Sequence, residues 1–160
     1  MAKKSGQLLS EQATENLATS LAAAIAAKPK AGCCVLALEG DLGAGKTFFA
    51  RALLRSQQVQ GAVKSPTYTL IEPYQCALGT VLHLDLYRLA DPEEMEYLGL
   101  QDQMESACLM MVEWPSKAGG LLPKVDLRLQ LSVVADGRHW QLNAGTAYGE
   151  TCLAALAEPE

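Results

Sequence analysis

One short stretch of the chain has the residue types and the spacing of a phosphate-binding loop. Residues 40–47, GDLGAGKT, match the pattern G-x-x-x-x-G-K-[ST]. Its glycines let the backbone wrap closely around a phosphate, and the positive N-terminal end of a following helix faces the same anion. Lys46 would reach the β- and γ-phosphates of a nucleotide, and the Thr47 hydroxyl would bind Mg²⁺. The predicted nucleotide-binding residues of this loop are Gly40, Asp41, Leu42, Gly43, Ala44, Gly45, Lys46 and Thr47.

Two carboxylates end apolar runs that are typical of buried strands. Asp85 lies in VLHLDLYRL (81–89), and Glu113 ends LMMVE. A carboxylate left unpaired inside a sheet is costly, so we expect each acid to bind Mg²⁺ or to orient the attacking water. The ends of parallel strands meet at one crevice, so both acids should share a single metal–water site, with Glu113 nearer to the metal. The predicted catalytic residues are Glu113, Asp85 and Lys46, and the predicted metal ligands are Thr47, Glu113 and Asp85.

Two further side chains lie next to these acids. His83 precedes Asp85 by two residues and therefore shares its face of the strand, and its position favours a core histidine over a catalytic one. Trp114 follows Glu113 directly, and from the residues alone core packing and lining of the site are equally open for its ring.

Phosphate-binding loops of this kind serve GTPases, kinases and ATPases. The chain has no D-x-x-G switch, and its nearest match to a guanine-reading [NT]-K-x-D motif is PKVD (123–126), which argues against GTP as the dedicated ligand. A small-molecule kinase would carry an arginine-bearing lid, whereas this chain has five arginines and no arginine-rich loop. The kinase remains the alternative. A scaffold protein with a relic loop is a third class, against which Asp85 and Glu113 both count.

Hydrophobic periodicity and turn residues predict the elements that position these side chains. The loop lies between an apolar strand and an amphipathic helix, which is the context that its motif requires. The predicted strands are 33–40, 80–89 and 107–114, with a hairpin of 125–134 and 138–144 and an edge strand or ordered loop at 65–74. The predicted helices are 10–28, 46–56, 91–105 and a short closing helix at 149–157. This order predicts an α/β fold, a three-layer P-loop NTPase domain whose mainly parallel sheet carries a C-terminal antiparallel hairpin.

Length and composition fit one cytoplasmic domain spanning residues 1–160. With 13 basic and 18 acidic residues the net charge is −5, which argues against a broad nucleic-acid-binding face. The five cysteines lack the paired spacing of a zinc site and are expected to be reduced thiols. We expect no membrane association, because the N-terminal stretch lacks a signal-peptide core and no apolar run approaches about 18 residues.

The motifs GDLGAGKT, SPTYTL, HLDLYRL and VEWP together closely resemble the TsaE (YjeE) family of small bacterial P-loop ATPases. Their order and spacing match over residues 14–138. The resemblance implies an ATP-binding, weakly hydrolysing subunit, with ATP and Mg²⁺ as cofactors, of the machinery that makes threonylcarbamoyladenosine in tRNA. It implies that the partners are the TsaD and TsaB subunits of the transferase and that tRNA is involved indirectly.

The same resemblance implies roles for residues outside the loop. It supports Asp85 as a magnesium ligand and moves Trp114 towards lining the site. It makes Ser65 and Thr67 part of a switch-like loop whose Thr67 hydroxyl senses the γ-phosphate or its metal. It places Arg138 and Thr14 near the nucleotide. Ser116 departs from the pattern, because relatives often carry an acid there.

Overall fold

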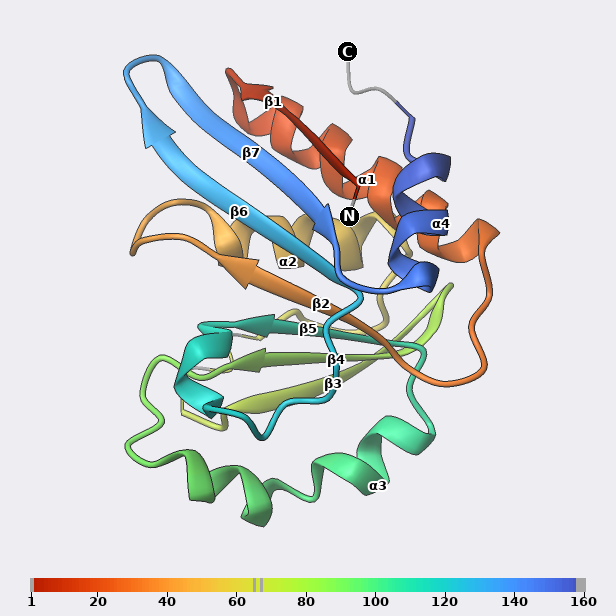
Figure 1. Cartoon of the computed structure of the whole chain (residues 1–160), viewed down its shortest axis with the longest axis vertical. Coiled ribbons are helices and arrows are strands. Elements are labelled where there is room, and N and C mark those ends of the chain that lie inside the picture. The colour runs from red at the N-terminus through yellow and green to blue at the C-terminus, as the bar shows by residue number, and fades with distance from the viewer. Residues whose placement is uncertain (1, 65, 67, 158–160) are drawn as a thin grey trace.

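The computed structural model describes residues 2–64, 66 and 68–157, and within these residues the strands form one sheet (Figure 1). The order of strands across the sheet is β1-β7-β6-β2-β5-β4-β3. The strands are β1 (Lys3–Leu8), β2 (Cys34–Glu39), β3 (Ile71–Cys76), β4 (Gly79–Asp85), β5 (Leu109–Glu113), β6 (Leu127–Val134) and β7 (Gly137–Ala144). The helices are α1 (Glu11–Ala27), α2 (Lys46–Ser56), α3 (Leu100–Glu105) and α4 (Ala147–Ala155), with short 3-10 helices η1 (Pro92–Leu98) and η2 (Pro115–Ala118).

The centre of the sheet is parallel, as the sequence predicts. Strands β6, β2, β5 and β4 run parallel to one another, whereas β7, β1 and β3 are antiparallel additions. The predicted hairpin is the β6–β7 pair, in which Val134 lies opposite Gly137. The predicted fold class is therefore confirmed.

Side chains of the central strands alternate between two apolar layers. On β2, Leu36 and Leu38 face the cluster that contains Phe49 of α2 and Leu17 of α1, and α4 packs on the same side. Val35 faces the opposite cluster, which is built from η1, α3 and η2 together with strand residues. Both faces of β2 and β5 are thus buried, which explains why their sequences read as continuous apolar runs.

The two edges of the sheet differ most from the elements that the sequence predicts. The prediction of an edge strand or loop at 65–74 is met in part by β3, which pairs only with β4 and carries Pro73. β1 was not predicted at all. It pairs only with β7, and of its six residues Leu8 alone is buried, so its sequence lacks the alternation that marks a half-buried strand.

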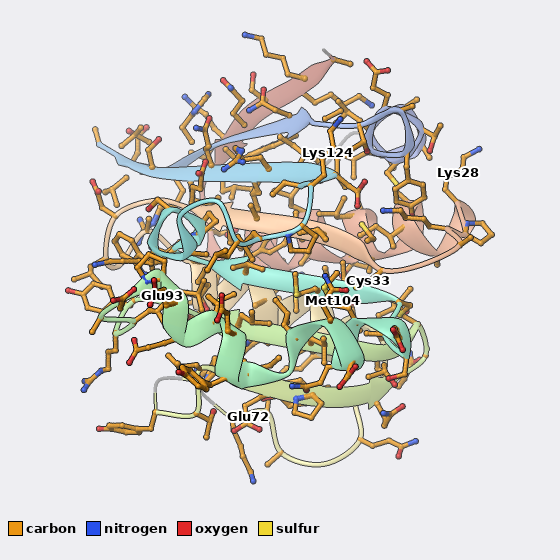
Figure 2. The ribbon with its side chains drawn as sticks, turned by 60° about the horizontal axis from the view of Figure 1, so that its bottom comes forward. Lys28, Cys33, Glu72, Glu93, Met104 and Lys124 are labelled. Carbon is orange, nitrogen blue, oxygen red and sulfur yellow. The ribbon has the colours of Figure 1, made fainter. Side chains whose placement is uncertain are left out.

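The single helix predicted over 91–105 is wrong. The capping box starting at Asp91 does form, but η1 ends at Leu98 and α3 begins at Leu100. Gly99 separates them with a φ of 63°, a left-handed conformation that glycine adopts without steric cost. Figure 2 shows this segment crossing in front of the sheet, where Met104 packs against the cluster that contains Cys33.

A buried carboxylate joins distant segments at the end of the sheet where β6 begins. Asp126 is 1% exposed. Its Oδ2 accepts hydrogen bonds from Val35 N (2.9 Å) and Lys30 Nζ (2.9 Å), and its Oδ1 accepts one from Thr146 Oγ1 (2.7 Å). Thr146 is also the N-cap of α4, so one carboxylate connects β2, the chain after α1, the start of β6 and α4.

No helix among the described residues is both long and apolar enough to cross a membrane.

Candidate nucleotide-binding site

The loop at residues 40–45 connects the end of β2 to the start of α2, as its motif requires. Gly40 has a φ of 149°, and a Cβ atom there would lie 2.4 Å from the Leu131 carbonyl oxygen of β6. No other residue type fits between the loop and the neighbouring strand without displacing one of them. The tight packing of the loop against β6 thus depends on glycine at this position.

Lys46 and Thr47 are the first two residues of α2, and their side chains contact different groups: the loop carbonyl oxygens and Glu113, respectively. Lys46 Nζ donates to the carbonyl oxygens of Gly40 and Asp41, the latter at 3.0 Å, and lies 4.3 Å from the centroid of the Trp114 ring. Burial lowers the pKa of the Lys46 ammonium, and the negative charges of Glu113 and Asp85 act in the opposite direction. A further anion beside Lys46 would favour its charged form.

Glu113 is the most enclosed acid of the site, with 2% exposure. Thr47 Oγ1 lies 2.8 Å from its Oε1 and 3.0 Å from its Oε2, and His83 Nε2 lies 2.7 Å from Oε2. These contacts satisfy a carboxylate that would otherwise be costly at the end of a buried strand.

Asp85 lies beside Glu113 because β4 and β5 are parallel and pair these two residues in register. Its Oδ1 accepts a hydrogen bond from Tyr87 N at 3.1 Å. Burial raises the pKa of the Asp85 carboxyl, the bond from Tyr87 lowers it, and the charge of Glu113 raises it further. The two strand ends therefore place both acids in one crevice, as the sequence predicts.

A pocket of about 620 Å³ opens over these residues. Its volume is within the range of about 300–1,000 Å³ that is typical of small-molecule sites. Of the predicted residues, the pocket is lined by Thr14, Leu42, Gly43, Ala44, Gly45, Lys46, Thr47, Asp85, Glu113, Trp114 and Arg138. Gly40 and Asp41 contribute the carbonyl oxygens that bind Lys46, whereas Ser65 and Thr67 lie outside the described residues.

Trp114 and Arg138 contact the site in different ways. Trp114 has a φ of 57°, and its ring lies over the Lys46 ammonium and 5.0 Å from the ring of Tyr87. Arg138 Nε donates to Ala44 O (3.1 Å) and its Nη2 to Gly43 O (3.2 Å). Arg138 therefore holds the backbone of the phosphate-binding loop, in addition to lining the pocket.

Leu8, Leu9, Tyr87 and His83 are among the residues that contribute to the site although the sequence does not predict a role there for them. Leu8 and Leu9 line the pocket from the end of β1, a strand that the sequence does not reveal. Tyr87 lines it from the segment after β4. The sequence predicts that His83 is a core residue, and it is fully buried, but it also contacts Glu113. The spacing of His83 and Asp85 predicts a shared strand face, but it does not predict the contact with Glu113 on the neighbouring strand.

The oxygen donors beside the loop suit a hard cation. No group of three or more His, Cys, Asp or Glu side chains in the described part of the chain is arranged to hold a metal by itself. Thr47, Glu113 and Asp85 instead offer one hydroxyl and two carboxylates next to the loop. Mg²⁺ bound with a nucleotide takes few protein ligands, because phosphates and water supply the others. The residues present fit that ion.

The chain is similar in sequence to a family of known proteins. The sequence model of a family described as "Threonylcarbamoyl adenosine biosynthesis protein TsaE" matches residues 8–140, far more than half of the chain. The chain belongs to the TsaE family. The range matched by the TsaE model contains every candidate residue of the site, from Thr14 to Arg138.

Individual TsaE relatives agree with this assignment. The tRNA threonylcarbamoyladenosine biosynthesis protein TsaE of Haemophilus influenzae is 43% identical over 120 residues, which cover 75% of this chain and 76% of that protein. The protein of the same name from Rickettsia bellii is 36% identical over 132 residues, which cover 82% of this chain and 88% of that protein. The crystal structure of Bacillus subtilis YdiB superposes with a TM-score of 0.76 at 26% identity, over 97% of this chain and 94% of that one.

Proposed function

We propose that this chain is the ATP-binding and slowly ATP-hydrolysing subunit of the machinery that forms threonylcarbamoyladenosine in tRNA, acting on the TsaD–TsaB transferase. Membership of the TsaE family supports the tRNA modification, since its relatives carry that biosynthesis in their names. The proposal includes a cytoplasmic location and an indirect relation to tRNA, through the transferase.

The observation that carries the ATPase part is the contact between Thr47 and Glu113. The hydroxyl that follows the loop lysine lies within 3.0 Å of both carboxylate oxygens of a buried acid. Asp85 is the register partner of that acid on the neighbouring strand. A hydroxyl and two acids around one end of a phosphate cradle support Mg²⁺-dependent nucleotide chemistry over simple anion binding.

Each residue then has a defined task. The loop amides and Lys46 bind and orient the phosphates, and Thr47 with one or both acids would hold Mg²⁺, which neutralises charge on the phosphates when bound. Glu113 accepts hydrogen bonds from the attacking water and orients it. Trp114 covers the Lys46 ammonium and excludes bulk solvent. Thr67 is proposed to sense the γ-phosphate, as the resemblance implies.

The kinase alternative differs in the fate of the phosphate. A kinase would transfer it to a small acceptor, whereas the proposed ATPase releases free phosphate. Arg138 would be a natural contact for a transferred phosphoryl group, but in this structure its guanidinium binds loop carbonyls. That arrangement favours the ATPase.

The proposal is tested by measuring ATP turnover with and without the TsaD–TsaB transferase, in the same reactions that score threonylcarbamoyladenosine in tRNA. We expect slow intrinsic release of phosphate that changes when the transferase is added, and modification that requires this chain. Lys46→Ala should abolish nucleotide binding or turnover and block modification. Turnover of Mg²⁺–ATP at the wild-type rate by the Lys46→Ala protein would contradict the assignment of the phosphate-binding site. If the level of tRNA modification did not depend on this chain, the proposed function would be wrong.

The two acids can be separated in the same assay. Glu113→Gln and Asp85→Asn remove one charge each without changing the side-chain shape. We expect Glu113→Gln to lower the turnover rate by about 100-fold and also to raise the Mg²⁺ concentration that turnover requires by more than Asp85→Asn does. A larger rise for Asp85→Asn would make Asp85 the acid nearer to the metal.

A further inference from the structure

His83 is a buried polar residue to which the proposed function gives no task. Its side chain is fully buried on β4, and its Nε2 lies 2.7 Å from Glu113 Oε2. Its strand face is shared with Asp85 and, through the β4–β5 register, with Met111 and Glu113. The imidazole therefore lies one strand position behind the proposed metal–water site.

The hydrogen bonding of this imidazole is incomplete. No residue in the described part of the chain contacts its buried Nδ1 with a hydrogen bond. Because an ionised Glu113 only accepts hydrogen bonds, the ring proton of a neutral His83 belongs on Nε2, and Nδ1 carries the bare lone pair. A buried polar atom without a partner costs about 1–3 kcal/mol. Val81 and Met111 lie on the same face and are apolar, so an apolar side chain at position 83 would suit its surroundings without that cost.

Folding stability alone therefore gives a poor account of a histidine here, whereas the geometry of Glu113 gives a good one. Within the described residues, the hydrogen bonds to the Glu113 carboxylate come from Thr47 and His83. Under the proposed function the Thr47 hydroxyl also binds Mg²⁺ through its oxygen, so its hydrogen bond to Glu113 depends on the position of the metal. The hydrogen bond from His83 involves no metal ligand other than Glu113 itself and fixes the carboxylate from the interior side.

We propose that His83 is a positioning residue that holds the Glu113 carboxylate in the orientation required for ATP hydrolysis. This inference rests on the proposed function of Glu113. His83 touches neither substrate nor metal and acts only through the hydrogen bond from Nε2 to Oε2. Side chains that orient an active-site group in this way change rates by about 10–100-fold when they are removed.

Four variants test this inference. His83→Leu removes the donor and keeps an apolar volume, whereas His83→Gln places an amide N–H at a comparable reach. Glu113→Gln is made alone and together with His83→Leu. The matched control is His139→Gln, which changes the other histidine of the chain, on β7 and outside the pocket. Turnover of Mg²⁺–ATP gives kcat and KM, and urea unfolding shows that each protein is folded.

We expect His83→Leu to lower kcat by about 10-fold or more with KM changed by less than about 2-fold, and His83→Gln to recover part of the loss. The double variant should be no slower than Glu113→Gln alone, because His83 acts through Glu113. A His83→Leu protein with wild-type kcat, or losses that simply multiply in the double variant, would overturn the inference.

A second measurement does not depend on turnover. Nitrogen NMR of the ring distinguishes the two tautomers, and we expect the proton of His83 on Nε2 in the nucleotide-free wild-type protein, with the His139→Gln variant identifying the signal. A ring proton on Nδ1 together with an unprotonated Nε2 would overturn the inference while leaving the proposed function untouched. Wild-type protein without Mg²⁺-dependent turnover would instead overturn the proposed function, and the positioning role with it.

Discussion

At the scale of single residues, the site places charges of opposite sign in a partly buried space. Lys46 loses solvation there, and so do Asp85 and Glu113, which face the same pocket. Lys46 attracts both carboxylates, but the two carboxylates share one crevice and repel each other, so the arrangement is not optimal for a protein without a ligand. Some folding stability is sacrificed for a site that suits a phosphate and a cation.

This sacrifice leads to a prediction about Asp85. Without Mg²⁺ or nucleotide, Asp85→Asn should unfold at a higher urea concentration than the wild-type protein at neutral pH. Burial raises the pKa of the Asp85 carboxyl above its ordinary value of 3.8, so folding disfavours the charged form. Asparagine keeps the acceptor for Tyr87 N and removes the charge.

The sign of the pH dependence follows from the same shift. At a pH above the raised pKa, the free energy of unfolding of the wild-type protein is lower than that of Asp85→Asn by the full amount. This difference disappears as the pH falls through the raised pKa to below 3.8, because Asp85 is then protonated in both states. Urea unfolding of both proteins from neutral to acidic pH measures the difference. A difference in unfolding free energy that stays constant over this range would contradict the prediction.

At the scale of elements, the loop between β2 and α2 depends on one glycine. Gly40→Ala should lower the free energy of unfolding by about 2–4 kcal/mol, because the added Cβ would meet the Leu131 carbonyl and the φ of 149° disfavours alanine. Gly61→Ala is the matched control, since Gly61 also has a positive φ of 81° but nothing lies within 4 Å of its added Cβ.

In the Gly61→Ala control the free energy of unfolding should fall by about 1–2 kcal/mol, from backbone strain alone. Chemical denaturation of both variants gives the two values. Equal losses in the two proteins would mean that the approach of the loop to β6 does not constrain this position.

How far the sequence predicts these elements depends on how much of each is buried. The strand before the loop is a continuous apolar run, the helix after it is amphipathic, and the predicted helix at 46–56 coincides with α2. The expected helix at 91–105 fails at Gly99, because a cap and a run of helix-forming residues do not reveal a left-handed turn in its interior. β1 is invisible because five of its residues are exposed or half-buried on a sheet edge.

Within the candidate site, residues of one local motif are easier to predict than contacts between strands. Side chains within a local motif, such as Lys46 and Thr47, are predictable from spacing alone. The meeting of Asp85 and Glu113 was predicted from the general behaviour of parallel strands, and the β4–β5 register meets that expectation. The contact between His83 and Glu113 depends on that register and on side-chain rotamers, which no pattern within one strand specifies.

At the scale of the whole molecule, Asp126 holds together segments that are far apart in the sequence. Asp126→Ala should lower the free energy of unfolding by about 2–4 kcal/mol, because it leaves Val35 N, Lys30 Nζ and Thr146 Oγ1 without their shared acceptor. Thermal or urea unfolding measures the loss.

Lys30→Ala is the control for this prediction. Its side chain is 30% exposed, so its removal should cost about 1 kcal/mol or less. Asp126 precedes β6 and lies outside the pocket, so ATP turnover by folded Asp126→Ala protein should match the wild type. A larger loss for Lys30→Ala than for Asp126→Ala would show that the ion pair, and not the buried acceptor, carries the stability.

The pairing of β1 with β7 also has a consequence for synthesis on the ribosome. Residues 3–8 leave the ribosome long before their strand partner at 138–143. A growing chain therefore carries the phosphate-binding loop long before Leu8 and Leu9 can close their side of the pocket. The complete pocket forms only after β7 has been made and has paired with β1, so a chain that ends before β7 would have an open and partial site.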